Sequence, residues 1–307
     1  MHLISKTKIG VIYITLCIVL WSLIPTVAKF AQTDLDHHQY LFYSSIISFL
    51  SIFIVSLFER NLKEIFTYSK TIFLILFALG FLDFIFYLLL YYGYKHANSL
   101  EVLVIQYMWP IFIVFLSLLI LKEDFTKKKL ISVMLGFFGV SLVITKGDFA
   151  NLDFSQINIL LIVMLGAFAF ALFSVLGKIV KVNATNAVMI YFFSAILYSI
   201  VTVSSYSSFI LPSGKDWIGI LINGAFINGV SYLFWIKGLQ IFDASKVAPF
   251  LFITPILAAF FLIIFFDEPI LTVYFVGLFF VVLSGLINSV KSLKPKRLIY
   301  ASKNRKC

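Results

Sequence analysis

Charged residues and cysteines are scarce in this sequence. Only 12% of the 307 residues are charged and 62% are hydrophobic, whereas a typical soluble domain carries about 25% charged residues. So many apolar side chains cannot be buried in one water-soluble core, and we therefore expect a polytopic membrane protein. The two cysteines, Cys17 in the first apolar run and Cys307 at the last position, exclude a disulfide framework.

The spacings typical of metal sites and of ATP-driven proteins are also missing. The four histidines, His2, His37, His38 and His96, lie at the N-terminus or in predicted loops. We interpret the pair His37–His38 as part of a solvated loop, since a metal site needs three or four converging ligands. No GxxxxGK[ST] sequence occurs, so ATP does not drive the protein directly. We expect no metal, no cofactor and no nucleic-acid partner, because the net charge of +10 comes from basic residues in short loops and a tail.

Ten apolar runs account for most of the chain. A helix needs about 20 apolar residues to cross the hydrocarbon core, and continuous runs predict helices rather than alternating barrel strands. The first run is longer than the apolar part of a signal peptide, about 7–15 residues, so we interpret it as a retained helix. The predicted spans are Ile9–Phe30, Gln39–Phe58, Thr71–Tyr94, Ser99–Leu121, Leu130–Thr145, Ile157–Val180, Ala187–Tyr206, Trp217–Ile236, Ala244–Phe266 and Ile270–Val290.

The fourth and ninth runs are copies of each other at a shift of 145 residues. Glu101–Glu123 returns as Lys246–Glu268, with nine identities over the 43 aligned positions 81–123 and 226–268. The identical pairs are Phe81/Phe226, Tyr87/Tyr232, Leu88/Leu233, Gly93/Gly238, Val102/Val247, Pro110/Pro255, Ile111/Ile256, Phe115/Phe260 and Glu123/Glu268. The prolines predict a broken helix in each copy, and paired broken helices point to a transport site.

The positive charges predict the orientation of the two copies. With the N-terminus in the cytoplasm, 20 Lys and Arg residues lie on the cytoplasmic side and four on the other, so we expect both termini in the cytoplasm of a cell membrane. Five spans per copy is an odd number, so the second copy is inverted. We expect one repeat at 8–147, a second at 157–291, and a basic tail at 292–307 that contacts lipid headgroups; a partner-binding tail is the alternative.

The duplicated motifs resemble the drug/metabolite transporter superfamily and, within it, the EamA-type carriers. The carrying residues are LWS at Leu20–Ser22, EV and QYMWP between Glu101 and Pro110, LKE at Leu121–Glu123, GFFGVSLVI at Gly136–Ile144, SYLFWIKGL at Ser231–Leu239, TP at Thr254–Pro255 and DEP at Asp267–Pro269. The EV and Trp-Pro pattern is most similar to the branch of bacterial aromatic amino-acid exporters. The chain departs from the family's pattern of small residues in the last helix of each repeat. Ser132 stands where the second repeat has Gly277, and Ser284 stands where the first repeat has Gly139. Serine still permits close helix packing.

Asp83 is the clearest candidate for a functional charge, because it lies halfway along the third predicted span and ionisable groups at membrane depth are costly. It would couple transport to protons or bind an amino group; the alternative is a silent acid that hydrogen-bonds two helices. Glu101 and Lys246 are repeat equivalents on opposite membrane sides. They are either gate charges of an alternating-access carrier or interfacial residues with no transport role.

The remaining candidates are aromatic and polar. Single Trp or Tyr residues near helix ends usually anchor the helix at the interface, but Tyr87, Tyr232 and Trp109 lie nearer mid-span. The resemblance implies a cavity between the repeats, for which Trp21 and Trp109 are the stronger choices. The full set is Trp21, Asp83, Tyr87, Gln106, Tyr107, Trp109, Asn223, Asn228, Tyr232 and Trp235.

Two further residue pairs mark breaks and ends of helices. Pro110 and Pro255 would free a backbone carbonyl for substrate or for flexing; the alternative is a static kink. We assign Glu123 and Glu268 a structural role, capping the start of the next helix.

From the resemblance we expect a secondary carrier that exports an amino acid or related metabolite by alternating access, with no catalytic residues. The alternatives are uptake or exchange of a nucleotide-like or cationic metabolite and, more remotely, a membrane-embedded transferase or a scaffold. The partners are then a small-molecule substrate and the lipid bilayer, with protons as a coupling option. The sequence leaves the oligomeric state open.

Overall fold

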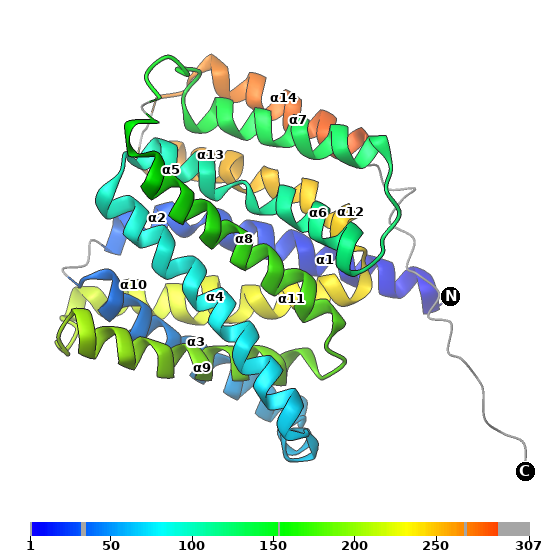
Figure 1. Ribbon diagram of the computed structural model, residues 1–307, viewed down its shortest axis with the longest axis vertical. Coiled ribbons are helices and arrows are strands. Elements are labelled where there is room, and N and C mark those ends of the chain that lie inside the picture. The colour runs from blue at the N-terminus through cyan, green and yellow to red at the C-terminus, as the bar shows by residue number, and fades with distance from the viewer. Residues whose placement is uncertain (1, 32–34, 153, 267–268, 288–307) are drawn as a thin grey trace, which may run out of the picture.

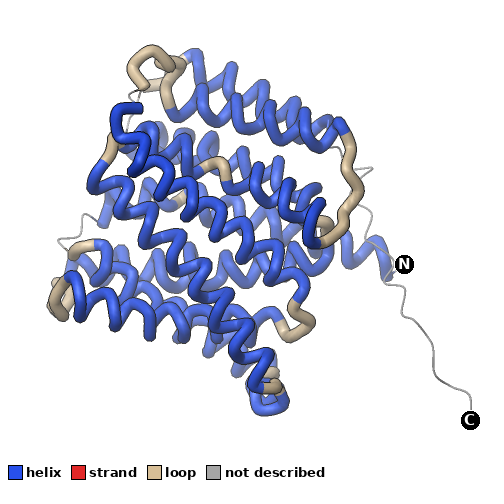
Figure 2. The backbone as a smooth tube through the Cα atoms, in the orientation of Figure 1, coloured by secondary structure: helices blue, strands red, loops and turns tan. Residues whose placement is uncertain are grey.

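The computed structural model describes residues 2–31, 35–152, 154–266 and 269–287, and every regular element in these ranges is a helix (Figure 2). The elements up to residue 147, which we call the first half, are α1 (His2–Ser22), α2 (Ile24–Ala31), α3 (His37–Glu59), η1 (Leu62–Thr67), α4 (Lys70–His96), α5 (Ser99–Gln106), α6 (Trp109–Ile120) and α7 (Lys127–Ile144).

The second half follows a short polar linker. Its elements are η2 (Phe154–Gln156), α8 (Ile157–Ile179), α9 (Ala184–Tyr206), α10 (Gly214–Ile222), the π-helix η3 (Asn223–Val230), α11 (Ser231–Ile241), α12 (Ala244–Val247), the 3₁₀-helix η4 (Ala248–Phe252), α13 (Ile253–Phe266) and α14 (Thr272–Ile287).

Eight helical stretches are long and apolar enough to cross a membrane. They run Lys6–Val27, His37–Glu59, Lys70–His96, Glu101–Ile120, Ile157–Ile179, Ala184–Tyr206, Gly214–Ile241 and Ala244–Phe266. The other two predicted spans correspond to α14, a shorter apolar helix, and to α7, whose first turn is Lys127–Lys129. An all-helical membrane protein is therefore confirmed, and the count of ten spans stays a prediction.

Side-chain caps fix where several helices begin and end. Asp36 accepts hydrogen bonds from the amides of His38 and Gln39, and the Gln39 side chain accepts from the Asp36 amide, which is a capping box at the start of α3. Burial would raise the pKa of Asp36, but hydrogen bonds from Ser207, Gln39 and His38 outweigh burial and lower it. At the other end α3 stops because Arg60 adopts a left-handed conformation with φ 57°.

Helices of the first half pack antiparallel against helices of the second half. In the α7·α14 pair, a Cβ added to Gly139 would lie 2.7 Å from the Gly277 carbonyl oxygen, and Ser132 donates to the Ser284 carbonyl at 2.7 Å. This pair lies at the top of Figure 1, and α3 lies beside α9 at the bottom. The small residues let the backbones approach closely, as is common between helices in membranes.

The same arrangement holds α4 against α8 and α1 against α11. A Cβ on Gly93 would collide with Val163 of α8, and one on Gly238 would collide with Ile14 of α1. Gly93 and Gly238 are equivalent at the 145-residue shift. Each therefore provides the close approach between its own helix and a helix of the other half.

Both proline-containing stretches are interrupted. The first is broken at Tyr107 and Met108, between α5 and α6, and Pro110 is the second residue of α6. In the second, η4 separates α12 from α13, and Pro255 is the third residue of α13. Each proline lies in a first turn, where its missing N–H leaves no helical hydrogen bond unmade.

The bundle has two ends, which we name by a residue at each. The Glu59 face carries Glu59, Glu123, Lys237 and the start of α1, and lies to the right in Figure 1. The Asp36 face carries Asp36 and the end of α9, which are joined by the Ser207 hydroxyl.

Candidate functional site

An aromatic cluster of Trp21, Trp109, Phe170 and Trp235 lies at the centre of the bundle. The Trp21 ring centroid is 5.8 Å from that of Trp109, 5.7 Å from that of Trp235 and 6.0 Å from that of Phe170. These rings come from α1, α6, α8 and α11, two helices from each half. Three of the four were predicted from the sequence; Phe170 was not, because 36 phenylalanines offer no local signal to distinguish one.

Two of the three indole N–H groups in this cluster, those of Trp21 and Trp235, have serine partners. Trp21 Nε1 donates to Ser231 Oγ at 2.7 Å, and Trp235 Nε1 donates to Ser174 Oγ at 3.1 Å. Each bond joins a tryptophan to a helix other than its own: Trp21 of α1 to α11, and Trp235 of α11 to α8. The rings are therefore held in defined orientations, which a stacking surface for a solute requires.

Next to the aromatic cluster lies a central quartet of Asp83, Tyr87, Asn228 and Tyr232. The Tyr232 hydroxyl donates to Asp83 Oδ1 at 2.8 Å, and the Tyr87 hydroxyl donates to Asn228 Oδ1 at 3.4 Å. The two hydroxyl oxygens are 3.1 Å apart. At the 145-residue shift Asp83 corresponds to Asn228 and Tyr87 to Tyr232, so each tyrosine donates to the acceptor of the opposite half.

The quartet is symmetric in geometry but not in charge. Asp83 is 4% exposed and has no ion-pair partner in the described part of the chain, and its carboxylate accepts from the Tyr232 hydroxyl. Since each phenol carries one proton, Tyr232 can donate either to Asp83 or to Tyr87. The protonation of Asp83 therefore determines which way the hydrogen bonds run between the two halves.

Toward the Asp36 face lie two further predicted cavity residues, Gln106 and Tyr107, and both are half-buried. Gln106 Oε1 accepts from the Tyr94 hydroxyl at 3.3 Å, and Tyr107 lies at the break between α5 and α6. Tyr87, Tyr91 and Tyr94 follow one another along a single side of α4, all half-buried. Tyr91 and Tyr94 were missed, although their spacing from Asp83 and Tyr87 in the sequence would have placed them on that side.

The predicted gate charges lie apart from the central quartet. Glu101 is in the first turn of α5 and is 2% exposed. Lys246 Nζ lies 2.6 Å from Asp243 Oδ2, one turn earlier at the start of α12. A gate role for either residue stays a prediction.

Glu123 caps a helix, but one more distant in the sequence than predicted. Its carboxylate accepts from the amides of Ala244 at 2.9 Å and Ser245 at 3.1 Å and from the Ser245 hydroxyl. It therefore caps α12 of the second half rather than the next helix, α7, which Thr126 caps. The equivalent residue Glu268 lies outside the described residues.

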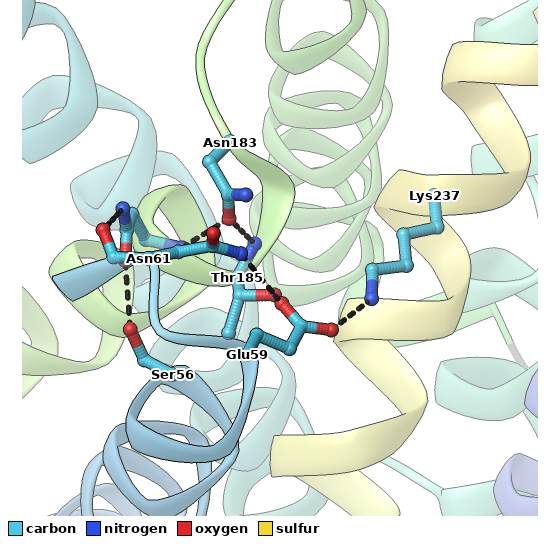
Figure 3. A network of polar contacts seen from close by, with 7 residues as sticks. Ser56, Glu59, Asn61, Asn183, Thr185 and Lys237 are labelled. Atoms are coloured by element: carbon cyan, nitrogen blue, oxygen red, sulfur yellow. Dashed lines mark hydrogen bonds and ion pairs between the residues drawn. The ribbon is translucent and has the colours of Figure 1, made fainter. Parts of the chain in front are cut away.

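A second carboxylate on the same face, Glu59, joins the two halves and was not singled out in the sequence. Its oxygens accept from Lys237 Nζ at 2.7 Å, Thr185 Oγ1 at 2.6 Å and Asn61 Nδ2 at 3.1 Å (Figure 3). Groups of three or more His, Cys, Asp or Glu residues that could hold a metal ion do not occur among the described residues.

Three kinds of comparison bear on this arrangement. A model of the EamA-like transporter family matches residues 8–145 and 157–290. The uncharacterized transporter YyaM of Bacillus subtilis is 30% identical over 55% of this chain and 57% of its own length. YoaV of the same species, also an uncharacterized transporter, is 26% identical over 83% of this chain and 87% of its own.

The chain covers part of the length of some relatives, and it shares its fold with a solved structure. The chain spans less than two thirds of YyaM and 63% of an uncharacterized transporter of Acidianus ambivalens that is 28% identical. One crystal structure superposes with a TM-score of 0.79 over 94% of this chain and 98% of that protein, at 15% identity. That likeness establishes a shared fold.

Proposed function

Because the chain belongs to the EamA-like transporter family, we propose that it is a secondary carrier that moves a small organic solute across a cell membrane by alternating access. The observation that carries the proposal is the central quartet, in which a buried carboxyl and its tyrosine partner belong to different halves. Any rocking of one half against the other changes the surroundings of Asp83. Transport and the state of Asp83 are thereby linked.

The architecture that we propose is ten spans in two inverted repeats, 8–147 and 157–291, followed by the basic tail 292–307. The two separate family matches support the division, and the antiparallel packing of α7 on α14 supports the inversion. The distribution of 20 and four basic residues supports cytoplasmic termini. On this assignment the Glu59 face is cytoplasmic.

The substrate class we propose is an amino acid or related metabolite, moved outward. The Asp83 carboxyl suits an amino group, and the indole rings of Trp21, Trp109 and Trp235 suit a flat or apolar portion. The resemblance to the aromatic amino-acid exporter branch supports the same class. Gln106 and Tyr107 would contact the solute on its way from the Asp36 face, and flexing at Pro110 and Pro255 would accompany closure.

The direct test is uptake of a panel of labelled amino acids into proteoliposomes, with and without a proton gradient. We expect saturable flux of aromatic or other neutral amino acids in the wild type. Asp83→Asn should abolish the pH dependence of flux while the protein still inserts and folds. Full flux with an unchanged pH profile in Asp83→Asn would show that Asp83 couples nothing.

Uptake or exchange of a cationic or nucleotide-like metabolite is the second candidate. It is favoured by the single carboxyl in the central quartet, which has no ion-pair partner among the described residues. Flux of organic cations or nucleotides in the same vesicles, with none for amino acids, would select it. The family is one of transporters, which favours transport over the more remote transferase.

A further inference from the structure

Glu59 lies on the Glu59 face, and Figure 3 shows its carboxylate between Thr185 and Lys237. It is the last residue of α3, and its carboxylate accepts from Thr185 of α9 and Lys237 of α11. Lys237 Nζ also lies 5.8 Å from the centroid of the Tyr13 ring on α1. We call these four residues, Tyr13, Glu59, Thr185 and Lys237, the Glu59 cluster; two come from each half.

The Glu59 cluster lies on the Glu59 side of the aromatic cluster. Lys237 comes two residues after Trp235 in α11. It comes five residues after Tyr232, which is about 7.5 Å along the helix axis. On α1, Tyr13, Cys17 and Trp21 are spaced by four residues and share one side of the helix. Cys17 is 0% exposed, so the space between the two clusters is closed to solvent on this side.

The residues equivalent to this ion pair, on the opposite face, are uncharged. At the 145-residue shift Lys237 corresponds to Tyr92, and α9, the counterpart of α3, contains no acidic residue. Towards that face the residues of α4 beyond the quartet, Tyr91 and Tyr94, are half-buried rather than buried. Two otherwise equivalent ends therefore differ in charge and in closure.

We propose that the Glu59 cluster is the gate of the Glu59 face, with the Glu59–Lys237 ion pair as the contact that must break for that face to open. The inference rests on the proposed carrier function and specifies how one side is held closed. Lys237 and Glu59 have side chains 23% and 31% exposed, so water reaches the pair and its loss shifts the balance modestly rather than unfolding the protein. Glu123, which follows α6 and accepts from the Ala244 amide of α12, provides a second contact between the halves on the same face.

Cys17 provides a native reporter for this gate. In a Cys307→Ser background it is the one thiol in the chain, and its alkylation by a charged maleimide can be followed in inverted and in right-side-out membrane vesicles. Glu59→Gln should speed labelling of Cys17 about two- to fivefold, in one vesicle orientation only, because a partly exposed ion pair contributes about that factor. The exchange Glu59→Lys with Lys237→Glu should restore slow labelling.

A reciprocal reporter separates a gate from local loosening. In a background without Cys17 and Cys307, the thiol introduced by Tyr94→Cys reports on the Asp36 face. If opening of one face closes the other, Glu59→Gln should slow its labelling by a similar factor. Glu64→Gln removes an exposed negative charge of the nearby η1 and is the matched control, which should change neither rate. Thr185→Val and Lys237→Gln test the same contacts separately if Glu59→Gln fails to fold.

Equal labelling rates in Glu59→Gln and Glu64→Gln would overturn the gate, even if solute flux is found. Faster Cys17 labelling that the charge exchange does not reverse would also overturn it. Restored slow labelling in the exchange variant supports the gate even if no solute in the panel is transported. In that case the failure lies with the proposed substrate.

Discussion

The near-symmetry of the central quartet predicts what an exchange of its two acceptors does. Asp83→Asn leaves both positions neutral, and the double variant Asp83→Asn/Asn228→Asp restores one carboxyl at the equivalent position in the other half. Tyr87 would then hold the carboxyl as Tyr232 does in the wild type. We expect the exchange to recover much of the function that the single variant loses.

The distances set the size of the effect. Tyr232 donates to Asp83 at 2.8 Å, and a hydrogen bond to a charged group contributes about 1.5–3 kcal/mol against about 1 kcal/mol for a neutral one. A difference of about 0.5–2 kcal/mol corresponds to a loss of about two- to thirtyfold in affinity for a solute or a proton. Tyr87 is 3.4 Å from Asn228, so the exchanged carboxyl must approach by 0.6 Å (3.4 less 2.8), and recovery to within about fivefold of the wild type is expected.

The assay is the initial rate of proton-dependent solute flux in proteoliposomes, measured for both single variants and the exchange. Asn228→Asp alone adds a second carboxyl close to the first, and like charges in one buried site oppose each other, so it should transport less than the wild type. An exchange variant no better than Asp83→Asn, beside a fully active Asn228→Asp, would refute the argument that the two positions are equivalent.

Two further predictions concern the contacts between the halves. Glu123→Ala should lower the thermal midpoint in detergent and cost about 2–6 kcal/mol, since the buried amides of Ala244 and Ser245 lose their acceptor and each unpaired donor costs about 1–3 kcal/mol. Glu123→Gln, which keeps an acceptor, should cost less than half as much, and an equal loss would contradict the capping role. Gly139→Ala should destabilise by about 1–3 kcal/mol in the same measurement because its Cβ would press on the Gly277 carbonyl at 2.7 Å, while Gly214→Ala, with nothing within 4 Å, should be neutral.

The helices were predictable because membrane length and hydropathy decide them. The predicted span Ile157–Val180 differs from α8 by one residue, and Ala244–Phe266 coincides with a described span. Pro110 and Pro255 likewise predicted the two interrupted helical stretches. What hydropathy did not supply was the start of α7, where Thr126 caps a turn of three lysines that an apolar window leaves out.

The central site was predictable to the extent that polarity at membrane depth is rare. Asp83 stood out for that reason, Trp21 and Trp109 were favoured by the cavity that the resemblance implies, and the 145-residue shift related Tyr87 to Tyr232. The shift did not say that each tyrosine would bond to the acceptor of the other half, because a repeat in sequence gives equivalence but not contact. Phe170, Ser174 and Ser231 carry common residue types, and they became visible once the helices were packed.

The charges that join the two halves were the hardest to predict. Glu59 and Glu123 lie at helix ends, where acids are ordinary, and their partners are 178 and 121 residues away in the chain. Glu101 and Lys246 attracted more attention because they are repeat equivalents. Equivalence alone favoured them, whereas the ion pair across the halves belongs to Glu59 and Lys237, whose equivalents, Ser204 and Tyr92, are uncharged.

That contrast indicates where function lies in a duplicated membrane protein. Gly93 and Gly238 are equivalent because both halves need the same close approach, and such residues build the scaffold. Asp83 corresponds to Asn228, and Lys237 corresponds to Tyr92, so in each pair only one of the two equivalent residues can carry a charge. A carrier with two fully equivalent halves would have no preferred face and no preferred end for a charged solute. The positions where the copies differ are therefore the ones that can give transport a direction, and Asp83 and the Glu59 cluster are the places to test it.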